Sequence, residues 1–357
     1  MGSGLARLRA NQGAIKSFAG RLGNPASLSR ERRGMDDTNK IVEKFNKKTG
    51  DNIAITLSSD SSLSTVFGYV SSGNIAIDRA IGKGIPAGRL TEIYGDSQSG
   101  KTLLAMQLIR DAQRRKGISI IFDTEHAFSK DLAKNVGINM DSLIYVAPES
   151  IENVFSYLEN FVDIVKESYK DKLCIIIWDS VAATPCKFEI DNPLDKQEIG
   201  TRARLISKGL RKVTSVISKN KIALVFVNQI RQNIGVMYGS PYTTPGGKAI
   251  KFHASVSLYL KEKGKIEDSR KRTIGRHGSL EVTKNKVFPP FRKAEFDVLF
   301  GQGVPKYSGL AESLVSDGII ESSGGWMKFG EKKFRANDIE KFINDNPDFA
   351  KEIGEAK

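Results

Sequence analysis

The chain has 357 residues, of which 39% are hydrophobic and 27% charged, and it contains only two cysteines, Cys174 and Cys186. No apolar run approaches the length of about 18 residues that a transmembrane helix needs, and neither a disulfide framework nor a secretory signal is evident, so we expect a cytoplasmic globular protein. The formal net charge of +14, from 55 Lys and Arg against 41 Asp and Glu, suggests an anionic partner such as nucleic acid or a membrane surface, although simple solubility explains it equally well.

The N-terminal region is basic, with seven Lys or Arg residues and one acid up to Arg33. Residues Met1–Gly34 show no sustained apolar periodicity, which predicts a flexible arm or a weakly ordered helix. Asp36–Lys48 predicts a short helix, and a Ser-rich stretch then leads toward the core, which we expect to begin near Gly73.

From Gly73 the pattern alternates between strand and helix, which argues for a mainly parallel sheet covered by helices. Beyond Phe252 apolar residues recur at every second position, and this period predicts antiparallel strands that extend the sheet. After Gly301 we expect a small α/β appendage whose helix begins with a capping pair, Asn337 and Glu340, and ends at Asn346-Pro347. The core strands are predicted at Leu90–Tyr94, Ile118–Phe122, Leu173–Trp178 and Ile222–Val227, and the helices at Thr102–Arg115, Ile151–Lys166 (with Ser150 as N-cap) and Arg202–Ser218.

The segment GDSQSGKT fits the pattern G-x-x-x-x-G-K-S/T between a predicted strand and a predicted helix. Backbone N–H groups of such a loop and the helix N-terminus form a positive concavity for phosphate oxygens. We expect Lys101 to reach the β- and γ-phosphates and the Thr102 hydroxyl to bind Mg²⁺, so the loop predicts binding of ATP or a close relative with Mg²⁺. The candidate contacts are Gly95, Asp96, Ser97, Gln98, Ser99, Gly100, Lys101 and Thr102.

Three further polar residues follow predicted strands. Asp179 ends an apolar strand and suits a Mg²⁺ ligand; the loop upstream favours this interpretation over a simple strand-end cap. Glu125 lies just past Ile118–Phe122, where a carboxylate could polarise an attacking water, although a surface carboxylate fits equally well. Gln229 could contact a γ-phosphate or merely close its strand.

Two irregular segments are candidates for binding a polyanion. Gln232–Lys248 is rich in Gly, Pro and Thr, and its length of about 17 residues exceeds that of the usual connection. Asp191–Gly200 precedes the predicted helix that carries Arg202, Arg204 and Arg211.

Taken together, the motifs of this chain resemble those of the bacterial RecA recombinases, in the same order from about Gly73 to Phe349, whereas Met1–Arg33 is unlike the usual bacterial start. The resemblance implies a RecA-like P-loop ATPase core with a mainly parallel central sheet, an N-terminal helical arm and a small C-terminal α/β domain, in a divergent or phage-encoded member. The matching segments are GDSQSGKT, DTEHA, IIIWDSVAA, FVNQIR, IGVMYG, TTPGGKAIKFHASV and VTKNK.

The resemblance also implies an organisation and an activity. Residues 1–72 would form the basic arm and oligomerisation region, 73–300 the ATPase core with DNA-binding loops, and 301–357 the small C-terminal domain. The implied activity is that of a DNA-dependent ATPase, with ATP and Mg²⁺ as cofactors, that forms a filament on single-stranded DNA and exchanges strands with homologous duplex in recombination and DNA repair. Its implied partners are single- and double-stranded DNA and further copies of itself, with no membrane.

Roles for particular residues follow from the same resemblance. Glu125 matches the catalytic glutamate and Gln229 the γ-phosphate sensor that couples ATP to a DNA loop. Lys284 and Lys286 match lysines that reach the ATP of the neighbouring subunit; without the resemblance, two solvated strand lysines would be the better interpretation. Together with Lys101 these four residues form the implied catalytic set.

For DNA, Asp191–Gly200 corresponds to the first DNA loop of the family and Ile230–Lys248 to the second. Glycine N–H groups and arginine side chains suit phosphate contact without base readout. The implied DNA-binding residues are Ile199, Gly200, Arg204, Arg211, Arg231, Ile234, Gly246 and Gly247.

The sequence also departs from the family. Leu132 stands where a tyrosine lies near the adenine, and Phe300 replaces a second tyrosine, so base stacking is expected to be weaker or altered; Phe300 is still a candidate nucleotide contact. Basic residues that the family has at three other positions are missing, and we hypothesise that a cationic cluster replaces them in holding the second duplex. This cluster comprises Arg270, Lys271, Arg272 and Arg276.

Two other classes of protein stay open at this point. A hexameric helicase or translocase on a related core would need an arginine finger and loading elements that we do not find in the sequence. A nucleotide-regulated DNA-binding or clock-type scaffold would hydrolyse little ATP. The candidate catalytic residues Glu125, Lys284 and Lys286 argue against this class.

Overall fold

The structure is a computed structural model that describes residues 25–50, 54, 66–193, 200–232 and 242–354. The chain forms two compact units, residues 1–65 and 66–357. In the first unit, α2 (Pro25–Thr49) begins well before the predicted helix Asp36–Lys48. Pro25 pre-sets the backbone of a first turn, and the Ser, Arg, Glu and Leu residues that follow it continue the helix.

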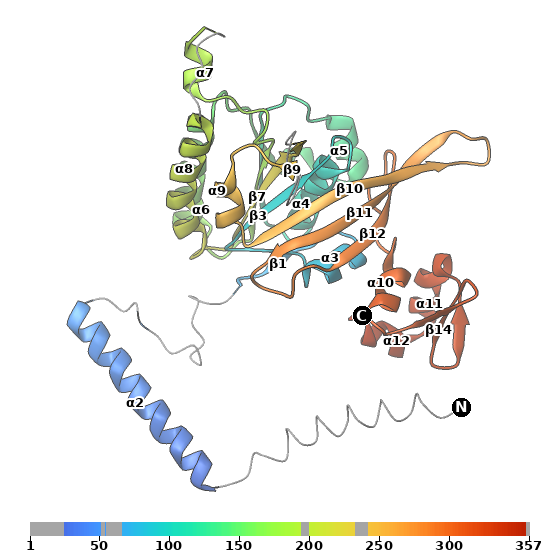
Figure 1. Ribbon diagram of the computed structural model, residues 1–357, viewed down its shortest axis with the longest axis horizontal. Helices are drawn as coiled ribbons and strands as arrows, with labels where there is room; N and C mark the ends of the chain where they lie inside the picture. Colours follow the sequence, from blue (N-terminus) through green and yellow to red (C-terminus); the bar gives the residue numbers. More distant parts are fainter. Residues whose placement is uncertain (1–24, 51–53, 55–65, 194–199, 233–241, 355–357) are drawn as a thin grey trace. The chain divides into compact units, whose positions relative to one another are not determined.

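The second unit is built on an eight-stranded sheet with the order β12-β11-β10-β3-β7-β6-β4-β5 (Figure 1). The strands from β10 to β5 in this order are parallel to their neighbours, whereas β11 and β12 are antiparallel and extend the sheet beyond β10. Both the predicted parallel core and its antiparallel extension are therefore confirmed. The strands are β3 (Leu90–Gly95), β4 (Ile118–Asp123), β5 (Leu143–Val146), β6 (Cys174–Asp179), β7 (Ile222–Gln229), β10 (Val256–Glu267), β11 (Thr273–Asn285) and β12 (Lys293–Leu299).

Helices cover both faces of the sheet because successive strand side chains point to opposite sides. Ile177 packs with the helices of one face, α3, α4 and α5, and the next residue, Trp178, packs with those of the other, α6, α8 and α9. Parallel neighbours need such crossover helices, so the two apolar layers follow from the strand order. The helices are α3 (Ile75–Ile81), α4 (Lys101–Arg114), α5 (Lys130–Val136), α6 (Ile151–Ser168), α7 (Lys187–Asp191), α8 (Thr201–Ile217) and α9 (Lys248–His253), with a 3₁₀ turn η1 (Met140–Ser142).

The predicted helices of the core match α4, α6 and α8 to within two residues at each end. Ser150 caps α6 as expected, since its hydroxyl accepts the backbone N–H of Asn153 at 3.2 Å. Short strand pairs outside the central sheet are β1 (Tyr69–Val70) with β2 (Ile85–Pro86) and β8 (Arg231–Gln232) with β9 (Tyr242–Thr243).

The C-terminal segment has its own apolar cluster, in which the rings of Phe334 and Phe342 stack at 4.0 Å between centroids and Phe349 is fully buried. The predicted capping pair is wrong: Asn337 lies inside a 3₁₀ turn, and Asp338 takes the N-cap position without a side-chain hydrogen bond. The elements are α10 (Leu310–Ser316), β13 (Glu321–Ser323), β14 (Trp326–Phe329), β15 (Lys332–Phe334), η2 (Ala336–Asp338), α11 (Ile339–Asp345) and α12 (Pro347–Glu352).

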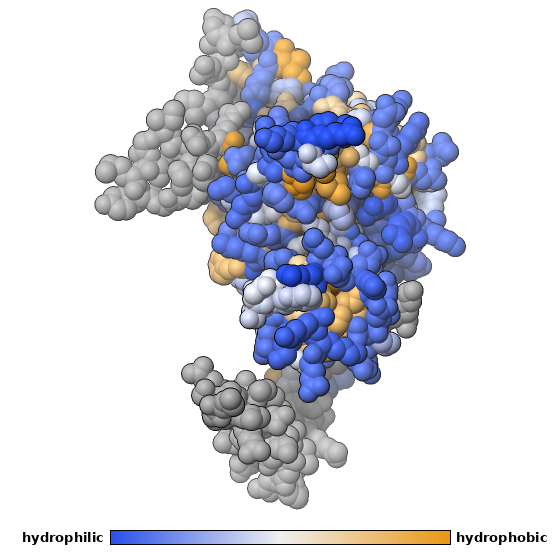
Figure 2. Space-filling view, turned by 90° about the vertical axis from the view of Figure 1, so that its right-hand side faces the viewer, coloured by the Kyte–Doolittle hydropathy of each residue, from blue (hydrophilic) through white to orange (hydrophobic). Residues whose placement is uncertain are grey.

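The face of the molecule drawn in Figure 2 is mainly hydrophilic, and its apolar residues form small separate patches. None of the helices among the described residues is both long enough and apolar enough to cross a bilayer.

The contact between α6 and α8 depends on a glycine, and this gives a test of the packing. A Cβ added to Gly209 would lie 2.4 Å from the ring of Phe155, which is itself held edge-on against Trp178 at 5.7 Å. Gly209→Ala gains about 1 kcal/mol of helix propensity but overpacks the interface by about 1–3 kcal/mol, so we expect a net loss of stability.

Urea unfolding measures this loss. The matched control is Ser215→Ala on the exposed side of the same helix, which should change the free energy of unfolding by less than about 0.5 kcal/mol. A Gly209→Ala protein that is more stable than wild type would show that α6 and α8 pack less closely than described.

Candidate nucleotide-binding active site

The carboxyl ends of four adjacent parallel strands meet at one edge of the sheet. The strand registers set Gly95 beside Gln229, and set Asp179 beside both Val227 and Asp123. Chain segments that are far apart in the sequence thereby deliver their polar residues to one place, as is usual for ligand sites of open α/β sheets.

The loop between β3 and α4 needs glycine at both of its ends. A Cβ on Gly95 would lie 2.0 Å from the carbonyl oxygen of Leu260, so no other residue fits there. Gly100 is the N-cap of α4 and adopts a left-handed conformation with φ of 91°, which favours glycine. The first N–H groups of α4 lack acceptors within the helix, and this end of the helix therefore suits a phosphate group.

Lys101 is buried and turns back onto its own loop. Its Nζ donates to the carbonyl oxygens of Gly95 at 3.1 Å and of Asp96. Burial lowers the pKa of Lys101, while the nearby carboxylates of Asp179, Asp96 and Glu125 act in the opposite direction. The ammonium group is thus already at the loop, with the loop's own carbonyls as partners.

Thr102 and Asp179 are in direct contact, because the Thr102 hydroxyl donates to Asp179 Oδ2 at 2.7 Å. Burial raises the pKa of Asp179 to about 6, and the nearby Glu125 and Asp123 add to this, whereas the Thr102 hydrogen bond acts against it. One hydroxyl and one carboxylate are hard oxygen donors of the kind that Mg²⁺ prefers. The described residues contain no group of three or more His, Cys, Asp and Glu side chains arranged to hold a metal ion.

Glu125 and Gln229 are brought together as well, and Gln229 Nε2 donates to Glu125 Oε1 at 3.1 Å. The hydroxyl of Ser180 donates to the same carboxylate oxygen. The sequence interpretation missed Ser180, whose only signal was its place directly after Asp179. Glu125 therefore has two side-chain partners that fix the orientation of its carboxylate.

Asp123 shapes the turn that carries Glu125, a role that the sequence interpretation also missed. Its buried carboxylate accepts backbone N–H groups from Glu125 at 3.2 Å, Ala127 at 3.3 Å and Phe128 at 3.0 Å. The Tyr145 hydroxyl donates to it at 3.0 Å. A carboxylate that accepts several donors is a rigid anchor, so the position of Glu125 is set by its neighbours on both sides.

A cavity of about 370 Å³ is lined by Lys101 and Thr102 of α4 and by the polar residues Glu125, Asp179, Ser180 and Gln229. Leu132 and Phe300 line it, as do Arg276 and Val298 of β11 and β12. The Arg276 guanidinium lies 5.9 Å from the Phe300 ring centroid and pairs with Glu262 at 2.6 Å. Arg276 thus lies at the cavity, which was not expected when it was grouped with Arg270, Lys271 and Arg272.

Lys284 and Lys286 do not line this cavity. Lys284 Nζ donates to the carbonyl oxygens of Lys251 and, at 3.2 Å, of Phe252, in the last turn of α9. Burial, followed by the charge of Lys286, lowers the pKa of Lys284. Within one subunit the structure therefore does not bring these two predicted catalytic lysines to the nucleotide site.

The candidate DNA contacts can be placed in part. Ile199 and Ile234 lie outside the described residues, and Arg231 is described only as backbone of β8. Arg204 and Arg211 are exposed on α8, which follows directly on Gly200.

Gly246 and Gly247 lie against the first half of α8. A Cβ on Gly246 would be 3.0 Å from the side chain of Ile206, and one on Gly247 would be 3.6 Å from that of Ala203. The fold therefore brings the end of the second predicted DNA loop beside the helix that follows the first.

The sheet order, the glycine-bounded loop and the Thr102–Asp179 pair define a P-loop ATPase core of the RecA type. The chain belongs to the RecA family, since residues 37–305 match the RecA N-terminal domain. Proteins named Protein RecA are similar to it: that of Chlorobaculum tepidum is 41% identical over 296 residues, which cover 83% of each chain. That of Porphyromonas gingivalis is 38% identical over 321 residues, or 89% of this chain and 91% of the relative, and that of Agrobacterium fabrum is 41% identical over 288 residues, or 80% and 77%.

The buried carboxyl group of Asp179 gives a prediction about pH. Because its pKa is raised to about 6, Asp179 holds its proton more tightly in the folded state than in the unfolded chain, where the pKa is about 4. The free energy of unfolding should therefore fall as the pH rises from about 4 to about 6. Asp179→Asn removes this contribution, and relative to wild type it should gain about 2 kcal/mol of stability between pH 4.5 and pH 7.5.

Urea unfolding in EDTA at the two pH values checks this gain. Ser215→Ala, at an exposed position of α8, changes no titratable group and should show the same difference from wild type at both. If the effect of Asp179→Asn were also independent of pH, the carboxyl group would not be titrating in this range.

Proposed function

We propose that this chain is a DNA-dependent ATPase that assembles as a filament on single-stranded DNA and catalyses homologous pairing and strand exchange. The observation that carries the proposal is the contact of Glu125 with Gln229 and Ser180 at the cavity that also contains Lys101 and Asp179. A glutamate held by two donors beside a phosphate-binding loop is suited to orient an attacking water. The similarity to proteins named Protein RecA supports the same reading.

Each side chain of the site then has a role in hydrolysis. Lys101 would leave the carbonyls of its loop and bind phosphate oxygens. Thr102 and Asp179 would hold Mg²⁺, which supplies positive charge to the phosphates when bound. Glu125 would orient the water, and Gln229, which is hydrogen-bonded to the same carboxylate, would sense the γ-phosphate through its amide group.

Gln229 also connects the site to the second DNA loop. It ends β7 and is followed by β8, while the preceding residue, Asn228, donates through Nδ2 to the carbonyl oxygen of Pro245 at 3.0 Å. Asn228 also contacts the buried carboxylate of Glu92 at 3.4 Å, and burial raises the pKa of Glu92. A shift of Gln229 on nucleotide binding would therefore be passed directly to the segment that contains Gly246.

The two lysines are proposed to act on the neighbouring subunit. Lys284 binds the end of α9, next to Phe252, whose side chain is 71% exposed. An exposed aromatic residue beside two cations suits an interface between subunits. Cations supplied from a neighbour would favour hydrolysis only when subunits are aligned, as they are in a filament.

The direct test measures ATP hydrolysis with and without single-stranded DNA, and then strand exchange between circular single-stranded DNA and homologous linear duplex. We expect DNA to stimulate hydrolysis by about tenfold or more, a coupling of ordinary size. Joint molecules should form only with homologous duplex. A helicase would unwind without homology, and a scaffold would show little turnover in either condition.

A mixing experiment tests the shared site. Glu125→Gln and Lys284→Ala proteins should each lose about 100-fold in DNA-stimulated hydrolysis. In an equal mixture an intact Glu125 meets an intact Lys284 of the neighbouring subunit at roughly one interface in four. Activity should therefore recover to roughly a quarter of wild type.

Glu149→Gln, an exposed carboxylate variant, is the control for folding and should behave like wild type. If mixing restored no activity although both variants bound DNA, Glu125 and Lys284 would be required in the same subunit.

A further inference from the structure

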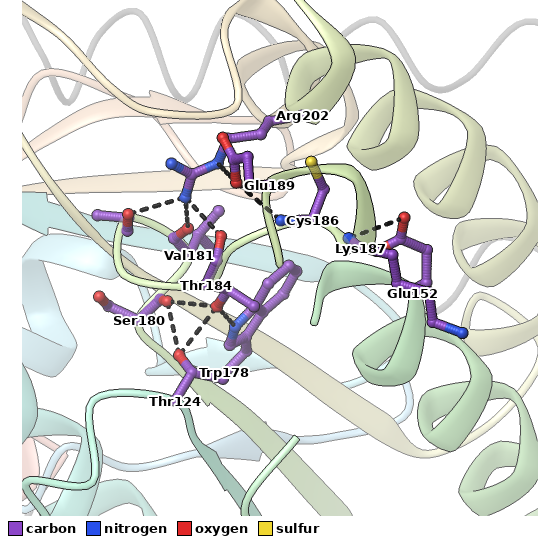
Figure 3. A network of polar contacts seen from close by, with 11 residues as sticks. Thr124, Glu152, Trp178, Ser180, Val181, Thr184, Cys186, Lys187, Glu189 and Arg202 are labelled. Carbon is purple, nitrogen blue, oxygen red and sulfur yellow. Dashed lines mark hydrogen bonds and ion pairs between the residues drawn. The ribbon is translucent and has the colours of Figure 1, made fainter. Parts of the chain in front are cut away.

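The first turn of α8 contains an arginine that points inward, between two predicted DNA contacts. Arg202 lies between Gly200 and Arg204, and its guanidinium reaches the turn that follows β6 (Figure 3). Nη2 lies 2.9 Å from the carbonyl oxygen of Ala182, 2.5 Å from that of Thr184 and 3.3 Å from that of Val181. Hydrogen bonds from a charged donor are stronger than neutral ones, so this contact ties α8 firmly to the turn.

The same arginine also contacts α7, the helix that precedes the predicted first DNA loop. Its Nε lies 3.9 Å from Glu189 Oε2, and Glu189 caps α7 by accepting the backbone N–H of Cys186 at 2.8 Å. Arg202 belongs to α8 and contacts α7, and it therefore joins the two helices that flank the predicted first DNA loop.

On its other side, the turn is hydrogen-bonded to the residues around the catalytic candidate. Thr184 Oγ1 accepts from Trp178 Nε1 at 2.9 Å, and it lies 2.8 Å from the Ser180 carbonyl oxygen and 2.9 Å from Thr124 Oγ1. Thr124 Oγ1 in turn donates to that carbonyl oxygen at 2.9 Å. Ser180 and Thr124 are the immediate neighbours of the site, because the Ser180 hydroxyl donates to the Glu125 carboxylate and Thr124 precedes Glu125 in the chain.

Arg202 takes no part in the chemistry itself, since it does not line the nucleotide cavity. Its planar guanidinium has several donors in a fixed arrangement and can serve three converging carbonyl groups together with one carboxylate. A lysine has a single donor nitrogen, which could not contact the carbonyl oxygens and the Glu189 carboxylate at the same time in this arrangement.

We propose that Arg202 is a positioning residue that transmits DNA binding at the start of α8 to the Glu125 carboxylate, through the turn of residues 181–184 and Ser180. This inference rests on the proposed DNA-dependent ATPase function. The connection through Arg202 would be separate from the one through Gln229. It would join the predicted first DNA loop, rather than the second, to the nucleotide-binding site.

The experiment compares wild type with Arg202→Ala, Arg202→Lys and Thr184→Val. Three quantities are measured: the ratio of ATP hydrolysis at saturating single-stranded DNA to hydrolysis without DNA, the KM for ATP, and the affinity for DNA by fluorescence anisotropy. Lys212→Ala is the matched control, because Lys212 is a cation of the same helix that forms an exposed pair with Glu159 at 3.3 Å.

Arg202→Ala should lower the stimulation ratio by about tenfold while the KM for ATP changes by less than about twofold. Arg202→Lys should recover part of the ratio. Thr184→Val should lower it too, since valine keeps the shape but removes the hydroxyl that joins the turn to Ser180, and this variant leaves the charge of α8 intact. Lys212→Ala should match wild type.

Several results would overturn the inference. An unchanged ratio in Arg202→Ala or in Thr184→Val would do so, as would a loss in Arg202→Ala that disappears at saturating DNA, because Arg202 would then be a DNA contact only. If Arg202→Ala failed to fold, an unchanged ratio in Thr184→Val would decide against the connection. Absence of DNA stimulation in wild type would instead overturn the proposed function and this inference together.

Discussion

The site depends on the parallel register of the four strands β3, β7, β6 and β4. Because neighbouring strands end together, Gly95 is aligned with Gln229 and Asp179 with Asp123 without any long loop. The apolar layers on the two faces of the sheet maintain this register, since a slip of one residue would turn every buried side chain to the wrong face. Packing far from the cavity therefore determines the geometry within it.

Burial then sets the charges of the site. The pKa of Lys101 is lowered and that of Asp179 raised, both mainly because the groups are withdrawn from water. Neither charge is fully compensated by protein groups alone. A polyphosphate with a divalent cation would offer negative charge to the first residue and positive charge to the second, so the two side chains together are complementary to such a pair.

Much of the fold and of the candidate site could be predicted from the sequence, wherever the signal lies in neighbouring residues. The apolar periods located the core strands and helices, and the glycine pattern located the loop before Lys101. The roles of Asp123 and Ser180 could not be predicted, because they depend on how chain segments turn back after a strand ends. The position of Arg276 at the cavity, beside Val298, could not be predicted because it follows from the register of β11 and β12, which the sequence pattern does not reveal. The cap of α11 was missed at a helix end, where competing local hydrogen bonds decide the boundary. The first part of α2 was missed because the sequence up to Gly34 shows no sustained apolar periodicity.

The backbone contacts of Lys101 affect the affinity of the loop for an anion. Its ammonium group donates to the carbonyl oxygens of Gly95 and Asp96, so the side chain closes the loop onto the start of α4. An anion that bound Lys101 would have to compete with these two backbone carbonyl groups for one cation. The measured affinity for such an anion would report the difference in free energy between the new contacts and the carbonyl contacts that they replace. Replacing Lys101 would therefore remove a contact that holds the loop as well as a cation for the anion.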